Sequence, residues 1–174
     1  LSVSSGYSSS TPVPPASKNI HSWAKITPGV AEIMKDFDSK IGLKEIQIDV
    51  INEVQNVKIT VTKYDGKPAS VSVVKSGRVY QYLEIKAENF GSNLEKAVAN
   101  FRVEKSWVSS NNLEKNEIAV FKYDESANKW NPLNTIYSSE DGTYHYYDVE
   151  LDSFSYFAIS EGSEKVEGGE VPVA

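Results

Sequence analysis

The stretch Thr143–Ser160, which reads TYHYYDVELDSFSYFAIS, constrains the fold more than any other part of this chain. From Tyr147 to Leu151 apolar side chains alternate with acidic ones, and this period of two is typical of a half-buried strand. The acidic turn Asp152-Ser153 follows, and a second, shorter strand bearing large rings is expected at Phe154–Ile159. Because one ring can remove about 150–250 Å² from water, we expect this pair of strands to close a hydrophobic core.

The same period of two recurs through most of the chain, and turn-forming residues separate the periodic segments. Helix is expected only as a turn or two at residues 31–38 and 106–112. Short strands with frequent turns predict an all-β fold, an antiparallel β-sandwich. The periodic segments are Ile46–Val50, Val57–Thr62, Val79–Ala87, Ala97–Glu104 and Ile118–Val120. The large rings expected to be mostly buried in the core are Trp107, Trp130, Phe154 and Phe157.

Both ends of the chain are low in apolar residues. Residues 1–18 form a Ser/Pro-rich tract and residues 161–174 a Gly/Glu-rich one, and each is typical of a linker. A proline-rich recognition motif around Pro12–Pro15 is the alternative for the first tract. The folded unit is therefore expected between residues 19 and 160.

Within that unit one short pattern occurs twice. The pattern I-x-V-x-K-Y-D is found at residues 59–65 and again at 118–124. It predicts two Ig-like halves of similar construction, a first β-sandwich half at 19–90 and a second at 94–160, packed together. Chance similarity between β-rich segments is the alternative.

Charge and composition restrict the partners. The net charge is −6 and the pI is about 5.0, whereas nucleic acids and anionic membrane surfaces select basic proteins. The chain has no cysteine, which excludes disulfides but leaves the compartment open. It contains no apolar run near the roughly 20 residues that span a bilayer, so we expect no membrane insertion within it.

No residue pattern indicates catalysis. The sequence lacks a Gly-x-Ser-x-Gly elbow, a phosphate-binding glycine loop and a dinucleotide fingerprint. His21 and His145 stand alone, while zinc sites take three or four ligands. Asp36 and Asp38 form a D-x-D without the Gly and Glu that complete a Ca²⁺ loop. We predict a protein that is not an enzyme, with no metal and no cofactor.

Four tyrosines are the remaining candidates for a site. Tyr80 and Tyr82 alternate with residues expected to face the core, beginning with Val79 and including Leu83, and Tyr144 and Tyr146 repeat this arrangement. An exposed strip of rings on a sheet could stack against sugars or meet another protein. The alternative is that tyrosine simply favours strands, or that these faces pack between the two halves.

Five blocks of sequence together resemble the PGF-pre-PGF domain of archaeal, methanogen-type cell-surface proteins. The likeness covers nearly all of residues 19–160, and the blocks FRVEKSW and FSYFAI are its most specific parts. The resemblance implies an extracellular module near the C-terminus of an exported, membrane-anchored protein of the cell envelope or S-layer, with no catalytic residues. The PGF tripeptide itself does not occur in this sequence. The five blocks are Tyr80–Ile85, Ala99–Trp107, Val120–Asp124, Lys129–Leu133 and Phe154–Ile159.

We therefore expect a non-catalytic module that acts as a structural spacer or assembly domain, with sheets that hold the chain ends apart near the anchor. A glycan-binding or protein-binding adhesion module is the second hypothesis, and an accessory domain of a secreted enzyme is the third. Possible partners are other cell-envelope proteins or surface glycan.

Overall fold

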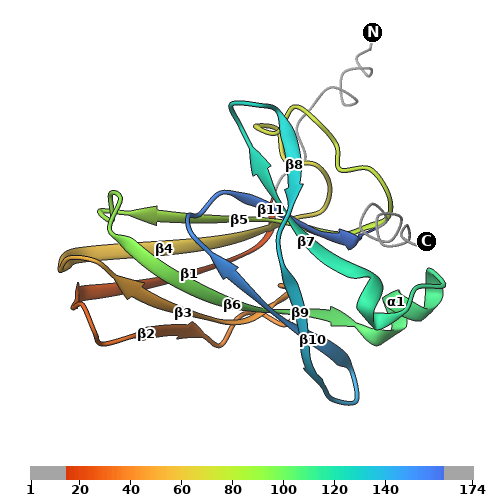
Figure 1. Ribbon diagram of the computed structural model, residues 1–174, viewed down its shortest axis with the longest axis horizontal. Coiled ribbons are helices and arrows are strands. Elements are labelled where there is room, and N and C mark those ends of the chain that lie inside the picture. The colour runs from red at the N-terminus through yellow and green to blue at the C-terminus, as the bar shows by residue number, and fades with distance from the viewer. Residues whose placement is uncertain (1–14, 163–174) are drawn as a thin grey trace, which may run out of the picture.

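The computed structural model describes residues 15–162. These residues form two antiparallel sheets packed face to face, which confirms the predicted β-sandwich (Figure 1). The six-stranded sheet has the order β1-β4-β5-β11-β7-β8 and the five-stranded sheet has the order β2-β3-β6-β10-β9. The strands are β1 Pro15–Ile26, β2 Glu32–Lys35, β3 Leu43–Val50, β4 Val54–Tyr64, β5 Val79–Glu88, β6 Leu94–Glu104, β7 Ile118–Asp124, β8 Lys129–Pro132, β9 Thr135–Glu140, β10 Tyr144–Leu151 and β11 Tyr156–Glu161. The helices are α1 Lys105–Ser110 and the 3-10 helix η2 Lys115–Glu117.

The stretch Thr143–Ser160 supplies one inner strand to each sheet. β10 lies between β6 and β9 in the five-stranded sheet, whereas β11 lies between β5 and β7 in the six-stranded sheet. Residues Asp152–Ser155 carry the chain from one sheet to the other, and we call them the crossing loop. The two strands thus face each other across the core and do not pair as a hairpin.

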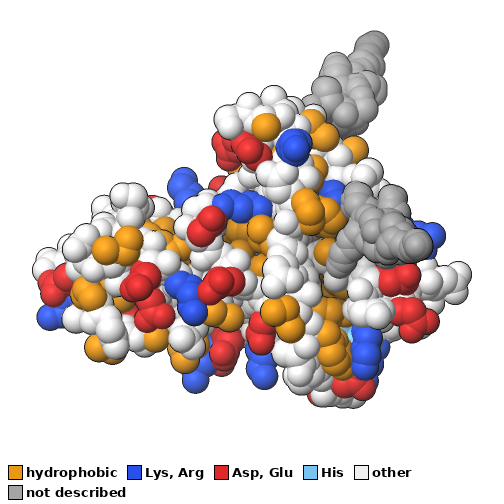
Figure 2. Space-filling model, viewed as in Figure 1, with side chains coloured by type: hydrophobic (Ala, Val, Ile, Leu, Met, Phe, Trp, Pro, Cys, Tyr) orange, Lys and Arg blue, Asp and Glu red, His pale blue; other side chains and the backbone are white. Residues whose placement is uncertain are grey.

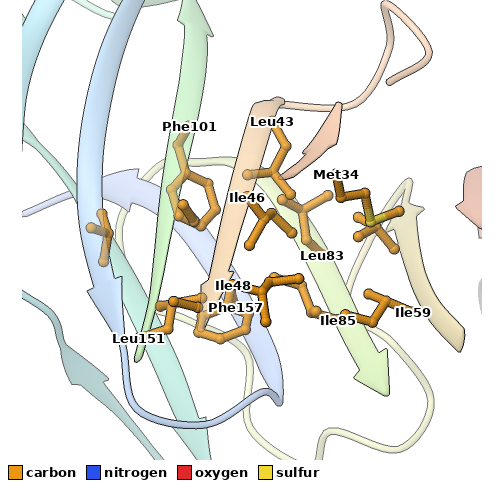
Figure 3. Packing of buried hydrophobic residues seen from close by; sticks show 14 of the residues in the cluster. Met34, Leu43, Ile46, Ile48, Ile59, Leu83, Ile85, Phe101, Leu151 and Phe157 are labelled. Carbon is orange, nitrogen blue, oxygen red and sulfur yellow. The ribbon is translucent and has the colours of Figure 1, made fainter. Parts of the chain in front are cut away.

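One main hydrophobic cluster fills the space between the sheets (Figure 3). Phe157 of β11 is fully buried, and its ring centroid lies 6.5 Å from that of Phe101 in β6. The expectation that these rings are mostly buried is confirmed: Phe157 is fully buried, and Trp107, Trp130 and Phe154 are of intermediate exposure and pack against the hydrophobic clusters. These three lie on helix α1, on the edge strand β8 and in the crossing loop, and not on an inner strand as Phe157 does.

The repeated I-x-V-x-K-Y-D pattern lies in β4 and β7, on either side of the central β5–β11 pair of the six-stranded sheet. Residues 19–90 and 94–160 both contribute strands to each sheet, through the pairings of β5 with β11 and of β3 with β6. The main cluster likewise contains residues from both ranges, so one core connects them.

The short helix expected at residues 31–38 is wrong, because Glu32–Lys35 form strand β2. This strand pairs with β3, and Met34 is buried opposite Ile46. A helix of two turns has little stability of its own, so pairing with an existing sheet edge determines the conformation. The second expected helix is present as α1.

A second, smaller cluster covers part of the outer face of the six-stranded sheet. Residues 65–78 pass over this cluster, where the Trp130 indole N–H donates a hydrogen bond to the carbonyl of Val73 (2.8 Å) (Figure 1). We call it the outer cluster. Its members are Tyr82, Ala119, Phe121 and Ala158, with Tyr64, Val79 and Trp130 packed against them.

An irregularity in the β5–β11 ladder changes the expected facing of the first tyrosine pair. Ser160 lies opposite Val79, whereas the preceding residue of β11 lies opposite Gln81, so Tyr80 is an extra residue on β5. Val79 consequently packs against the outer cluster and Tyr80 against the main core. The prediction that Val79 faces the core, with Tyr80 beside Tyr82 on the opposite face, is therefore wrong.

The two ends of the described range lie in the same half of the six-stranded sheet. Pro15 pairs with Tyr64 of β4, which pairs with Tyr82 of β5, which in turn pairs with Ala158 of β11. From Ala158, β11 continues to Glu161. Strands lie about 4.8 Å apart with about 3.3 Å per residue, so Pro15 and Gly162 are about 20 Å apart. β1 begins within the tract assigned to the first linker, while residues 1–14 and 163–174 lie outside the described part of the chain.

Candidate functional site

The four tyrosines of the predicted strip lie in three different environments. Tyr82 is 6% exposed and lies beneath residues 65–78. Its hydroxyl accepts a hydrogen bond from the backbone N–H of Lys75 (3.0 Å), and its ring centroid lies 5.7 Å from that of Trp130. Burial raises the pKa of the Tyr82 hydroxyl. This ring therefore belongs to the packing of the outer cluster.

Tyr80 lies between the sheets, next to helix α1. Its ring meets the indole of Trp107 edge-on, with a centroid separation of 5.2 Å. Its hydroxyl accepts a hydrogen bond from the backbone N–H of Glu104 (3.3 Å), and burial raises its pKa to about 12. The ring closes this side of the core and ties β5 to the end of β6.

Tyr144 and Tyr146 are neighbours at the start of β10, with ring centroids 6.1 Å apart. Cationic side chains lie 5.0 Å from the centroids of both rings, Arg102 over Tyr144 and Lys44 over Tyr146. Each cation is attracted to the negative face of its ring. Only the Tyr144–Tyr146 pair thus remains together, and neighbouring side chains already occupy its rings.

Asp141 holds the second ring in place from the turn before β10. The Tyr146 hydroxyl donates a hydrogen bond to one carboxylate oxygen of Asp141 (2.6 Å), and the N–H groups of Thr143 and Tyr144 donate to the other (2.8 Å each). These three bonds lower the pKa of Asp141 to about 2. Burial and the adjacent carboxylate raise the pKa of Tyr146 to about 12.

A hollow lies at the other end of β10, beside the crossing loop, and none of the four tyrosines lines it. We call it the edge groove. Its volume is about 520 Å³, and its walls are the end of β5 and the crossing loop. The outline of the molecule is notched between the β7–β8 hairpin and the ends of β4 and β5 (Figure 2). The lining residues are Glu84–Ala87, Phe90–Ser92, Leu94, Glu125 and Asp152–Tyr156.

The edge groove exists because β11 is shorter than β5. The N–H of Ile85 donates a hydrogen bond to the carbonyl of Ser155 (3.0 Å), just before β11 begins at Tyr156. Backbone groups of alternate residues point to the same side of an antiparallel strand, so the N–H and C=O of Ala87 also point into this gap. No strand among residues 15–162 pairs with Ala87 on that side.

Acidic side chains exceed basic ones around the edge groove. Glu84, Glu125 and Asp152 line it, with Lys86 as the one basic lining residue. A second hollow of about 520 Å³ lies on the other side of the crossing loop, between that loop and β7. There the Lys122 ammonium lies 3.0 Å from Asp152 and lowers the pKa of that carboxyl.

Another group of titratable side chains surrounds Glu140 at the end of β9. Its carboxylate accepts hydrogen bonds from the Tyr137 hydroxyl (2.5 Å) and the Lys105 ammonium (3.3 Å), and these bonds lower its pKa. His145 Nδ1 lies 3.2 Å from the same carboxylate, and burial lowers the pKa of this imidazole. The group joins the β9–β10 hairpin to the start of helix α1.

The two histidines lie in separate parts of the structure. His21 is exposed and its ring lies 4.4 Å from that of Trp23, far along the chain from His145. Within the described range, no three His, Cys, Asp or Glu side chains are grouped so that they could hold a metal ion. The helices of that range are also too short to cross a membrane.

Comparisons of this chain with protein-family models, curated proteins and solved structures find no match. The site is therefore interpreted from its own geometry. Sequence reasoning directed attention to the tyrosines and missed the edge groove. The acidic turns at Asp124-Glu125 and Asp152-Ser153 were the available signal, but turn chemistry alone accounts for such residues.

Proposed function

We propose that this chain is a non-catalytic assembly module of an exported archaeal cell-surface protein, and that it projects to the side of the chain that carries it. The position of the two ends of the described range supports this proposal. Pro15 and Gly162 lie in one half of the six-stranded sheet, about 20 Å apart by strand spacing and residue rise, whereas the 12-residue strand β1 alone is about 40 Å long.

This arrangement favours assembly over a spacer that holds the chain ends apart. A spacer adds length when the chain enters and leaves at opposite ends of the domain. Here the chain leaves at the finish of β11, while the crossing loop and the edge groove lie at its start. The groove is therefore directed away from the point at which the chain continues, where a partner can reach it. The resemblance to PGF-pre-PGF domains supports the surface location.

The test is cosedimentation of the purified chain with envelopes isolated from a methanogenic archaeon. An assembly module is expected to pellet with the envelopes in a saturable manner, and this binding should be lost after protease treatment of the envelopes. An acidic protein of similar size that has no envelope partner serves as the control for trapping. Pelleting no greater than that of the control would contradict the proposal. Binding that survives protease treatment but is lost after periodate oxidation of the glycans would support the adhesion module instead.

A further inference from the structure

We propose that the edge groove binds an extended, basic segment of a partner protein, which adds a short strand to the free edge of β5. This inference deepens the proposed assembly function and rests on it. Three properties of the groove carry it: an unpaired length of strand, an apolar floor and an acidic rim.

The unpaired strand selects a polypeptide in extended conformation. The ladder between β5 and β11 ends where Ile85 donates to Ser155, and Ala87 presents the next N–H and C=O to the groove. A segment of main chain that continues the line of β11 along β5 would pair with both groups. Backbone pairing of this kind gives affinity, and the pockets for alternate side chains give specificity.

The floor of the groove suits alternate apolar side chains of such a segment. Phe90 is buried beneath it and Phe154 is half-buried, with their ring centroids 6.1 Å apart. Leu94 and Ala87 complete the apolar lining. In an extended peptide every second side chain points to the same face, so alternate side chains of the bound segment would pack on these rings.

The acidic rim determines which charge suits the other side chains of the bound segment, those that point away from the floor. Glu84, Glu125 and Asp152 lie around the groove, while Lys86 is its one basic lining residue. The Glu84 carboxylate already accepts a hydrogen bond from the Tyr64 hydroxyl (3.1 Å), and Asp152 lies against Lys122, so Glu125 is the most available anion. Lysine or arginine at the outward positions complements this rim. A second copy of this chain carries a net charge of −6 and fits it poorly.

The experiment uses the full chain labelled with ¹⁵N and a capped hexapeptide of alternating lysine and valine as the probe. Saturable shifts of the Ile85 and Ala87 amides are expected, with hydrogen exchange at Ala87 slowed at least tenfold. The matched variants are Glu125→Lys in the rim and Glu104→Lys, an exposed acid at the far end of β6. We expect Glu125→Lys to raise the Kd for the lysine-valine hexapeptide at least fivefold, because the rim then carries two acidic and two basic side chains. Glu104→Lys should leave this affinity within a factor of two.

Three outcomes would overturn the inference. The first is a set of saturable shifts along the long edge strand β1 in place of β5. The second is an equal loss of affinity in the two variants, which would indicate attraction to net charge alone. The third is the absence of binding by the unaltered chain. If envelope binding persists in Glu125→Lys while the peptide fails to bind, the assembly function stands and the groove is not its site. If the peptide binds at Ala87 but envelopes are not bound, the groove stands without the proposed function.

Discussion

The two ends of β10 use their polar groups in opposite ways. At its start, the hydroxyl of Tyr146 and the carboxylate of Asp141 bond to each other, and cations cover the rings. Beyond its last residue, Leu151, the crossing loop leaves Ala87 of the neighbouring sheet unpaired on one side within the described range, beside a hollow with an acidic rim. At the start of β10 the polar groups bond to one another, whereas at the crossing loop the backbone groups of Ala87 face a hollow. The tyrosines therefore contribute to packing here, whereas the early end of β11 leaves the groove at which we propose that another chain binds.

Truncation of Phe157 is expected to lower the free energy of unfolding more than any other change. Comparison with Phe154 shows how tightly the crossing loop is packed relative to the core. Phe157→Ala should lower the free energy of unfolding by about 3–5 kcal/mol, because it removes a fully buried ring and leaves a cavity. Phe154→Ala removes a partly buried ring of the crossing loop and should cost about 1–2 kcal/mol, because less apolar area is lost. Urea denaturation of the two variants measures both. Equal losses would show that the loop end is as tightly packed as the core.

Removal of single hydroxyls should have smaller effects that follow burial. Tyr82→Phe removes the acceptor of the Lys75 backbone N–H beneath residues 65–78, and we expect a loss of about 1–2 kcal/mol. Tyr144→Phe removes only an exposed 3.4 Å bond to the carbonyl of Ser39 and should change stability by less than about 0.5 kcal/mol. The same urea series provides the measurement. A larger loss for Tyr144→Phe would mean that the start of β10 is held by this hydroxyl.

The fold was predictable from the sequence because it depends on local alternation. The period of two in β4, β6 and β10 places their apolar side chains in the core regardless of which strands pair. Pairing itself is non-local, so the local pattern predicts neither the strand β2 nor the extra residue at Tyr80. The edge groove depends on where β11 begins relative to β5, a register that no local pattern encodes.

The smallest expected effect is a pH dependence at the start of β10. The pKa of Asp141 is held at about 2, below its ordinary 3.8, by the Tyr146 hydroxyl and two backbone N–H groups. The unfolded chain therefore binds the proton first on acidification. The stabilisation by this carboxylate is fully present above pH 3.8 and is lost as the pH falls towards about 2. The pKa of Tyr146 is raised to about 12, so its contribution is present below pH 10 and is lost as the pH rises towards about 12.

Asp141→Asn tests this dependence and returns to the comparison between the two ends of β10. An amide cannot titrate, so the variant should lose less stability than the unaltered chain between pH 4 and pH 2, although it is less stable at neutral pH. Asp152→Asn is the matched change in the crossing loop, where the pKa of the carboxyl is lowered mainly by Lys122. Asp152 has one cationic partner, whereas Asp141 has three hydrogen-bond donors. The fall in stability between pH 4 and pH 2 should therefore be reduced more by Asp141→Asn than by Asp152→Asn. Thermal melts across this pH range give the answer. If both variants reduce the fall in stability by the same amount, the carboxylate at the start of β10 stabilises the fold no more than the one in the crossing loop does.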